Sequence, residues 1–213
     1  MAAPERFWNR IAPRYARQPI ADVADYRTKL AKTQALMRPD MTVLEFGCGT
    51  GATALLHAPH VASYTAIDFS PAMIGIAGAR PDRPANLTFA VAEIGGWVGP
   101  EGGYDMVLGL SVLHLMPDLG RTLSQVHRLL APGGRLVTST TCIRDRGGVL
   151  VRLLPLMTRL GIAPYVAPLS TESLRRAIVA AGFTISETWA PGPGKAVFIT
   201  AQKPPARSGE MAA

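Results

Sequence analysis

The sequence predicts an α/β fold built on a doubly wound, largely parallel sheet, and three observations support this. Short apolar segments alternate with helical stretches from residue 42 onward, and a glycine-rich turn follows the first of them. The last two apolar segments, 183–189 and 196–200, are joined only by Pro191-Gly-Pro-Gly194. Alternating strands and helices favour parallel βαβ units, whereas a short turn between two strands makes a hairpin. We therefore expect a parallel sheet with an antiparallel last strand.

The individual elements follow from hydrophobic spacing and from cap and turn residues. The expected strands cover 42–46, 61–67, 87–91, 104–110, 135–140, 183–189 and 196–200. The expected helices cover 5–17, 22–37, 71–79, 119–130 and 171–181, with a further short helix that ends near His57. Ser70 is the expected N-cap of helix 71–79. Pro132-Gly133-Gly134 is expected to end helix 119–130.

This pattern predicts one domain over residues 1–213. Residues 1–40 form a helical lid, residues 41–202 form the α/β core, and residues 203–213 form a polar, disordered tail. The strongly apolar segment 144–170 lies between the fifth strand and the last helix, so we expect an insertion that covers the substrate. Ordinary core packing is the alternative, and contact of this segment with a membrane surface also stays open.

The composition limits the class of protein. The 213 residues, 48% of them hydrophobic, are ample for a sizeable core. No apolar run approaches the ~18 residues that a membrane-spanning helix needs, and the charged N-terminal residues lack the apolar centre of a signal peptide. Cys48 and Cys142 are too few for a disulfide framework and too far apart for a metal knuckle. We expect a soluble, cytoplasmic protein without a metal site.

The formal net charge of +7 at pH 7 is unusual. It fits a nucleic acid, an anionic membrane surface, an acidic small substrate or no specific partner. Nucleic acid is disfavoured because the sequence has neither a recognition module nor a Lys-rich run. The surplus arginines lie mainly in the N-terminal helices and in 144–159, so we expect them outside the ligand pocket. The oligomeric state stays open.

The most informative motif is Glu45-Phe-Gly47-Cys-Gly49-Thr-Gly51, where the first strand meets a helix. Glycines let a ligand approach the backbone, and a helix N-terminus supplies oriented N–H groups. Asp68 ends the second strand about 20 residues later, the position from which an acid accepts hydrogen bonds from ribose hydroxyls. The two features predict a nucleoside-containing ligand, and a tight glycine turn without a ligand is the alternative.

The identity of that ligand depends on Glu45. The glycines also satisfy the dinucleotide pattern, so a nicotinamide-dependent oxidoreductase stays open. A carboxylate at the mouth of the loop repels a pyrophosphate but attracts an ammonium and a sulfonium, and S-adenosylmethionine carries both. The terminal hairpin also argues against a simple dinucleotide fold. A non-catalytic cofactor-binding module is the third reading.

Five further segments carry a family resemblance: VLEFGCGTG at 43–51, AIDFSPAMI at 66–74, FAVAEI at 89–94, YDMVLGLSVLHLMPD at 104–118 and LLAPGGRLV at 129–137. With them, about 40–202 resembles the class I S-adenosylmethionine-dependent methyltransferases. The opening FWNRIAPRYARQPIADVADY resembles the helical lid of bacterial members that act on small molecules. The resemblance implies a Rossmann-like, seven-stranded sheet with an antiparallel last strand. It also implies methyl transfer to a small acceptor, with a lipophilic one as an option, and S-adenosylhomocysteine as the product.

The resemblance also implies a set of cofactor contacts. Glu45 would orient the methionine amino group, and Asp68 would hold the ribose. Glu93, at a position where the family usually has Asp, would accept from the adenine amino group. The full expected set is Tyr15, Glu45, Gly47, Cys48, Gly49, Gly51, Asp68, Phe69, Met73, Glu93, Ile94 and Leu110.

Of the four histidines, His114 is a candidate for chemistry, and His57 and His60 have no predicted role. His114, just after the fourth strand, is a candidate general base or acceptor hydrogen-bond partner. A pocket-wall residue without a proton role is the alternative, because methyl transfer often needs only alignment and desolvation. His57 and His60 are expected at the surface. Tyr15 and Tyr26 are expected either to close over the cofactor or to pack beneath the lid.

Overall fold

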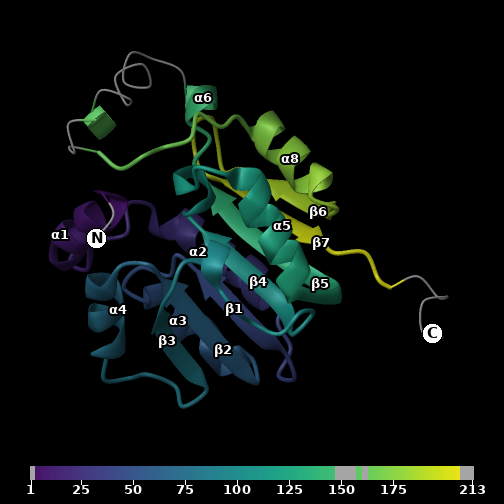
Figure 1. Cartoon of the computed structure of the whole chain (residues 1–213), viewed down its shortest axis with the longest axis horizontal. Coiled ribbons are helices and arrows are strands. Elements are labelled where there is room, and N and C mark those ends of the chain that lie inside the picture. Colours follow the sequence, from purple (N-terminus) through teal and green to yellow (C-terminus); the bar gives the residue numbers. More distant parts are fainter. Residues whose placement is uncertain (1–2, 147–156, 160–162, 207–213) are drawn as a thin grey trace.

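Seven strands form one sheet, in the order β3-β2-β1-β4-β5-β7-β6, in the computed structural model of the chain, which describes residues 3–146, 157–159 and 163–206 (Figure 1). The strands are β1 (Thr42–Phe46), β2 (Ser63–Asp68), β3 (Leu87–Val91), β4 (Tyr104–Leu110), β5 (Leu130–Thr140), β6 (Thr184–Trp189) and β7 (Val197–Gln202). Neighbouring pairs from β3 through β5 are parallel, whereas β7 is antiparallel to both β5 and β6. The predicted fold, with its antiparallel last strand, is confirmed.

Helices cover both faces of this sheet (Figure 1). They are α1 (Ala3–Tyr15), α2 (Val23–Gln34), α3 (Ala52–His57), α4 (Pro71–Gly78), α5 (Leu119–Leu129), α6 (Ile143–Arg146) and α8 (Thr171–Ala180). The predicted cap of α4 is confirmed, because the Ser70 hydroxyl accepts a hydrogen bond from the Met73 backbone N–H at 3.2 Å. No helix within the described ranges combines the length and apolar character needed to cross a bilayer.

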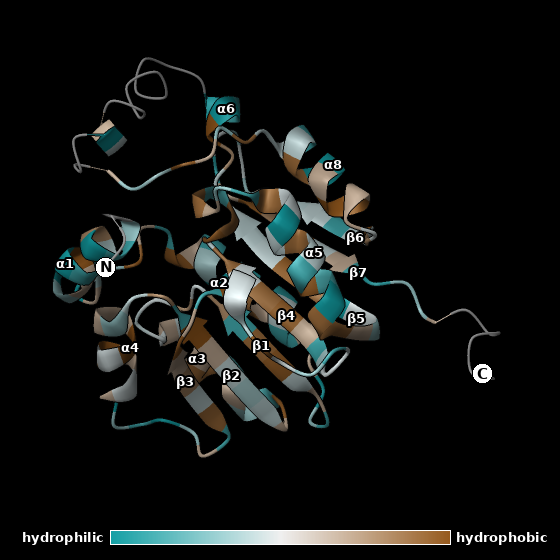
Figure 2. Cartoon of the chain, viewed as in Figure 1, coloured by the Kyte–Doolittle hydropathy of each residue, from teal (hydrophilic) through white to brown (hydrophobic). Residues whose placement is uncertain are grey.

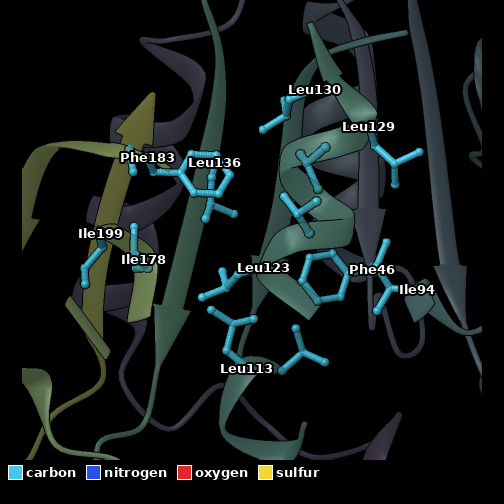
Figure 3. Close-up of a cluster of buried hydrophobic side chains, with 14 of the residues drawn as sticks. Phe46, Ile94, Leu113, Leu123, Leu129, Leu130, Leu136, Ile178, Phe183 and Ile199 are labelled. Atoms are coloured by element: carbon cyan, nitrogen blue, oxygen red, sulfur yellow. The ribbon is translucent and has the colours of Figure 1, made fainter. Parts of the chain in front are cut away.

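The core consists of two clusters on opposite faces of the sheet. One cluster joins the sheet to α5 and α8, and its members include Phe46, Leu123, Leu136, Ile178 and Ile199 (Figure 3). The second cluster joins the other face to α3 through Val43, Tyr64, Leu108, Phe198 and Ala54. The central strands are accordingly largely hydrophobic, whereas α1 carries several hydrophilic segments (Figure 2). Parallel strands appear in a sequence as short continuous apolar runs because both faces of the sheet are buried.

The start of β5 and the start of the C-terminal tail differ from the prediction. We expected Pro132-Gly133-Gly134 to separate a helix from a strand at 135, but β5 already begins at Leu130. Leu130 pairs with Tyr104, and the register then shifts before Met106, so the glycines lie in an irregular stretch of the strand. The predicted disordered tail is also wrong at its start, since the Lys203 ammonium donates to two backbone carbonyls at 2.8 and 2.9 Å.

The predicted insertion at 144–170 is only partly described. Residues 147–156 and 160–162, which include most of the apolar segment expected to cover the substrate, lie outside the described residues. Its last part lies against the loop that follows β4. The Ala167 N–H donates to the His114 carbonyl at 2.7 Å. The end of the segment therefore borders the carboxyl edge of the sheet, where ligands of open α/β sheets bind.

Candidate functional site

A pocket of about 760 Å³ opens at the carboxyl ends of β1, β4 and β5. Its lining includes Glu45 of β1, Leu110 of β4 and Ser139 of β5, each of which is the last or next-to-last residue of its strand. Glu45 pairs with Leu108, and Leu110, two residues further along β4, pairs with Ser139. Because side chains alternate along a strand, these three residues share one face of the sheet. They form a row with an acid at one end and a hydroxyl at the other.

Helix α2 forms the opposite wall. The lining residues of this helix and its cap follow a spacing of three and four, which places them on one helical face: Asp22, Asp25, Tyr26, Lys29, Leu30 and Thr33. A helix that packs on a core carries an apolar stripe at this spacing. The polar stripe of α2 is therefore the sequence signal for a pocket-facing helix, and the sequence interpretation missed it.

The glycines of the loop are required for different structural reasons. Gly47 and Gly51 adopt positive φ angles of 65° and 73°. A Cβ on Gly47 would lie 2.4 Å from Val112 Cγ2, and a Cβ on Gly51 would lie 2.6 Å from Phe89 Cζ. Both distances are too short for any side chain, so these two glycines are needed for packing of the loop against the protein itself.

Gly49 is the loop glycine at which an added Cβ would make no close contact. Its φ is 55°, and the nearest atom to an added Cβ is Tyr15 Cε1 at 3.6 Å. Its backbone N–H donates to Asp68 Oδ2 at 2.9 Å, and the Ser70 N–H donates to Oδ1 at the same distance. Burial raises the pKa of Asp68, and these two hydrogen bonds oppose the rise. Each carboxylate oxygen keeps a further lone pair for a ligand hydroxyl.

Tyr15 brings the end of α1 next to this loop. The residue ends α1, and it is 43% exposed while lining the pocket. Burial of the phenol and the nearby charge of Asp68 raise the Tyr15 pKa. The same helix is held on α4, because the Ser70 hydroxyl donates to Asn9 Oδ1 at 2.6 Å. Helix α1 is therefore anchored on the α4 side, with Tyr15 next to the glycine loop.

Glu45 is a buried carboxyl group with one side-chain partner. It is 2% exposed, and Oε2 accepts a hydrogen bond from the Tyr64 hydroxyl at 2.8 Å. Burial raises the Glu45 pKa to about 7; the Tyr64 hydrogen bond opposes this rise and the charge of Asp68 adds to it. Burial and the two carboxylates also raise the pKa of the Cys48 thiol, so Cys48 is a neutral thiol rather than a nucleophile.

The pocket brings together only part of the predicted cofactor set. The predicted residues that line it are Tyr15, Glu45, Gly47, Cys48, Gly49 and Leu110. The lining does not include Gly51, Asp68, Phe69, Met73, Glu93 or Ile94. Met73 and Ile94 are 1% and 4% exposed, whereas Glu93 is an exposed residue that precedes a short 3-10 helix. Glu45, expected at the methionine amino group, thus lines the pocket, whereas Asp68 and Glu93, expected at the ribose and the adenine, lie outside its lining.

His114 lies in the short 3-10 helix η3 (Leu113–Leu115), outside the lining of the pocket. Its Nδ1 is buried and has no hydrogen-bond partner among the described residues. Burial, with a smaller contribution from the charge of Arg146, lowers the His114 pKa to about 4. The imidazole is therefore neutral near pH 7.

Two sequence expectations about this region are wrong. His57 is not a surface residue: it is fully buried and lines the pocket, and neither ring nitrogen has a partner among the described residues. Burial, with His60 adding, lowers its pKa to about 4. The expectation that the surplus arginines lie outside the pocket is also wrong, since Arg146 lines it. Four basic residues line it, namely Lys29, Arg80, Arg146 and Lys195.

No group of three metal-ligating side chains comes together within the described ranges. The comparisons with known proteins instead point to one family. The family profile of a methyltransferase domain matches residues 14–188. A crystallised S-adenosylmethionine-dependent methyltransferase from Mesorhizobium loti has a TM-score of 0.70 and 19% identity, and the match covers 85% of this chain and 99% of that chain. At that identity the likeness shows the fold.

Curated relatives match shorter parts. A highly reducing polyketide synthase of Purpureocillium lilacinum is 30% identical over 138 residues, which cover 58% of this chain and 5% of the synthase. A malonyl-[acyl-carrier protein] O-methyltransferase of Paenibacillus sp. (strain JDR-2) is 37% identical over 105 residues, which cover 46% of this chain and 38% of that protein. The chain thus spans about a twentieth of the synthase and under half of the second relative.

The family match covers most of the chain, and the strand order agrees with it. The chain belongs to the methyltransferase domain family, and its sheet has the strand order of the class I fold.

Proposed function

We propose that this enzyme methylates a small organic acceptor inside the pocket at the ends of β1, β4 and β5. The observation that carries the proposal is the row from Glu45 through Leu110 to Ser139 within one pocket of about 760 Å³. The row offers an acid for a cationic cofactor at one end and a hydroxyl for an acceptor at the other. When bound, S-adenosylmethionine supplies an electrophilic methyl group on a sulfonium, and S-adenosylhomocysteine remains as the product.

The residues of the pocket fit that cofactor on two observations. The buried carboxyl of Glu45 suits an ammonium or sulfonium, because a nearby positive charge favours the ionised form of a carboxyl whose pKa burial has raised. Gly49 lines the pocket beside the carboxylate of Asp68, to which its N–H donates, and an added Cβ there would meet only Tyr15, at 3.6 Å. We therefore assign the methionine amino group to Glu45 and the ribose hydroxyls to Asp68. We assign the adenine to the remaining predicted residues: Phe69, Met73, Glu93 and Ile94.

The lid supplies alignment and exclusion of water. The lining includes most of the link between α1 and α2, together with the polar face of α2. We propose that residues 1–40 act as the lid on a core at 41–202, and that 144–170 covers the acceptor. Holding the acceptor in line with the methyl carbon and sulfur converts a bimolecular displacement into an effectively unimolecular one. A roof that removes water strengthens the electrostatic contacts beneath it.

His114 is proposed as a hydrogen-bonding group for the acceptor: it lies outside the pocket lining, but near enough to the lining residue Arg146 for that charge to lower its pKa. Its neutral imidazole offers one acceptor and one donor nitrogen. A pKa of about 4 makes it a weak general base near neutral pH, because proton transfer is most efficient when the pKa of the base is close to the working pH. Positioning of the acceptor, rather than proton removal, is therefore the role that its surroundings favour.

The acceptor is proposed to be a small acyl or other lipophilic compound. The names of the relatives support this: polyketide synthases and a malonyl-[acyl-carrier protein] O-methyltransferase. A pocket of about 760 Å³ also suits a small molecule better than a nucleic-acid duplex. Neither Cys48 nor Cys142 forms a disulfide, which supports a proposed cytoplasmic location.

A coupled S-adenosylhomocysteine release assay tests the proposed function. The panel contains lipophilic carboxylic acids, acyl thioesters, phenols, amines, a nucleic acid and a protein, each with S-adenosylmethionine as the donor. We expect turnover with at least one small acyl or lipophilic acceptor, and its loss when Glu45 is changed to Ala. Turnover confined to nucleic-acid or protein acceptors would contradict the proposal. In a parallel thermal-shift measurement, stabilisation by NADH without stabilisation by S-adenosylhomocysteine would do the same.

A further inference from the structure

The β5 side of the pocket holds a hydroxyl group with no partner. Ser139 pairs with Leu110 on one side and with Phe198 of β7 on the other. The residue is 3% exposed, and its Oγ makes no hydrogen bond with any described residue. Its neighbour Ser111 is held at a φ of 58°, with its N–H donating to the Ser139 carbonyl at 2.7 Å. A buried hydroxyl that faces a pocket without a partner favours a ligand with a polar atom there.

An ammonium group faces the same pocket from α2. Lys29 is half-buried and, among the described residues, forms no ion pair. The nearby carboxylates of Asp22 and Asp25 bind Lys195 instead, at 2.5 and 3.3 Å. Burial lowers the Lys29 pKa, and the two carboxylates offset this only in part. The protein thus desolvates this ammonium without fully compensating its charge.

The two groups belong to the same end of the pocket. Lys195 lies near enough to Lys29 for its positive charge to lower the Lys29 pKa. Lys195 is two residues from Val197, and Val197 pairs with Thr140, the residue after Ser139. These links place Lys29 toward the β5–β7 side. Glu45 and the glycine loop lie at the β1 side, with Leu110 between the two ends. The cofactor is assigned to the β1 side, so the β5–β7 side is left for the acceptor.

We propose that Lys29 and Ser139 form a subsite for a carboxylate group of the methyl acceptor. The proposal rests on the proposed function and narrows its acceptor to a molecule that carries a carboxylate. An ammonium and a hydroxyl both donate hydrogen bonds, and such bonds to an ionised oxygen are stronger than those between neutral groups. The methionine carboxylate of the cofactor is the other source of the same chemistry, and the position beyond Leu110 favours the acceptor.

The test uses the full chain loaded with S-adenosylhomocysteine and two probes of equal chain length, octanoate and octanamide. Calorimetry at pH 7.5 is expected to show octanoate binding at least about tenfold more tightly than octanamide. Lys29→Met and Ser139→Ala are expected to remove that preference, whereas Lys29→Arg is expected to retain most of it. Arg27→Met is the matched control, since Arg27 is exposed on the same helix and lies outside the pocket lining. Thermal unfolding verifies that each variant is folded.

A second arm separates the two sources of a carboxylate. 5′-Methylthioadenosine lacks the amino-acid part of S-adenosylhomocysteine. If Lys29→Met weakens S-adenosylhomocysteine about tenfold or more and leaves 5′-methylthioadenosine unchanged, the carboxylate belongs to the cofactor and the acceptor subsite is overturned. Wild-type protein that binds S-adenosylhomocysteine but shows no preference for octanoate also overturns the subsite. Failure to bind S-adenosylhomocysteine at all would instead contradict the proposed function.

Discussion

The hydroxyl of Tyr64 donates a 2.8 Å hydrogen bond to Oε2 of Glu45 between two neighbouring strands, where both residues are at most 2% exposed. Tyr64 lies on β2 beside Val43, and Glu45 is two residues further along β1. The bond holds the carboxyl group at the mouth of the glycine loop, while burial raises the pKa of that carboxyl to about 7. The group assigned to the cationic cofactor is thus close to half ionised at neutral pH before any ligand binds.

The stability of the ligand-free protein is predicted to depend on Glu45. Its pKa is about 7 in the folded chain, against an ordinary value of 4.5 that the unfolded chain retains. The folded chain therefore holds the Glu45 proton more tightly than the unfolded chain does. The free energy of unfolding is highest below about pH 4.5, and it falls as the pH rises from about 4.5 to about 7. The loss amounts to something on the order of 3 kcal/mol.

Thermal unfolding of the wild type and Glu45→Gln at pH 4.5 and pH 7.5 measures this effect. Glutamine does not ionise, so the variant is expected to gain stability relative to the wild type as the pH rises. Other titrating groups affect both proteins alike and cancel in the difference. A difference that stays constant over this range would show that the Glu45 pKa is not raised.

Asp68→Ala is predicted to weaken S-adenosylhomocysteine binding by about 100-fold or more. The change removes the acceptor assigned to the ribose and also frees the N–H groups of Gly49 and Ser70, each held at 2.9 Å. Hydrogen bonds to a charged group contribute roughly 1.5–3 kcal/mol each. Calorimetric titration measures the loss.

The control for this variant is Asp105→Ala. Asp105 also accepts a backbone hydrogen bond, from the Thr42 N–H at 2.8 Å, at the other end of the sheet. Its loss is expected to lower the melting temperature while leaving S-adenosylhomocysteine affinity unchanged. Equal affinities for wild type and Asp68→Ala would contradict the assignment of the ribose.

The three loop glycines are predicted to separate stability from binding. Ala at Gly47 or Gly51 places a Cβ 2.4 or 2.6 Å from a packed side chain, and overpacking of this kind costs roughly 1–3 kcal/mol in addition to the left-handed strain. Ala at Gly49 meets only Tyr15, at 3.6 Å. Gly49→Ala is therefore expected to lose several degrees less in melting temperature than the other two. It is nevertheless expected to lose cofactor affinity.

Thermal unfolding and calorimetry on the three variants test this separation. Equal melting temperatures for all three would show that the loop packs differently from the contacts described here. Unchanged affinity in Gly49→Ala would show that the cofactor does not approach the backbone at that residue.

His114 is predicted not to titrate near neutral pH. With a pKa of about 4, it stays neutral between pH 5.5 and 9, so it contributes no limb to the pH profile of kcat/KM in that range. His114→Gln is expected to lower kcat with an acceptor from the panel, because the acceptor loses a positioning contact, while the shape of the profile is retained. A limb near pH 6.5 that disappears in His114→Gln would instead identify a titrating general base.

The predictable features of the fold are those with local signals. β1, β3 and β4 begin and end at the predicted residues because apolar runs and turn residues mark them. The Ser70 cap and the terminal hairpin have equally local signatures. The early start of β5 does not, since Leu130 joins the strand only through its pairing with Tyr104.

The site was less predictable because its members meet only through tertiary packing. Glu45 and Gly49 carry a recognisable motif, and both line the pocket. Lys29 and His57 carry none, and their role depends on where α2 lies across α3 and the strand ends. The polar stripe of α2 was readable in the sequence, but only if the helix was known to face a pocket. The place of Ser139 in the pocket could be predicted only with the knowledge that this residue lies at the carboxyl end of β5.

The most direct test of the account is a crystal structure of the protein with S-adenosylhomocysteine. We expect the ligand amino group within hydrogen-bond distance of Glu45 and the ribose hydroxyls on Asp68. The sulfur is expected near Leu110, with the side toward Ser139 left open for the acceptor. A ligand whose homocysteine part lies outside this pocket, without contact to Glu45, would contradict the account.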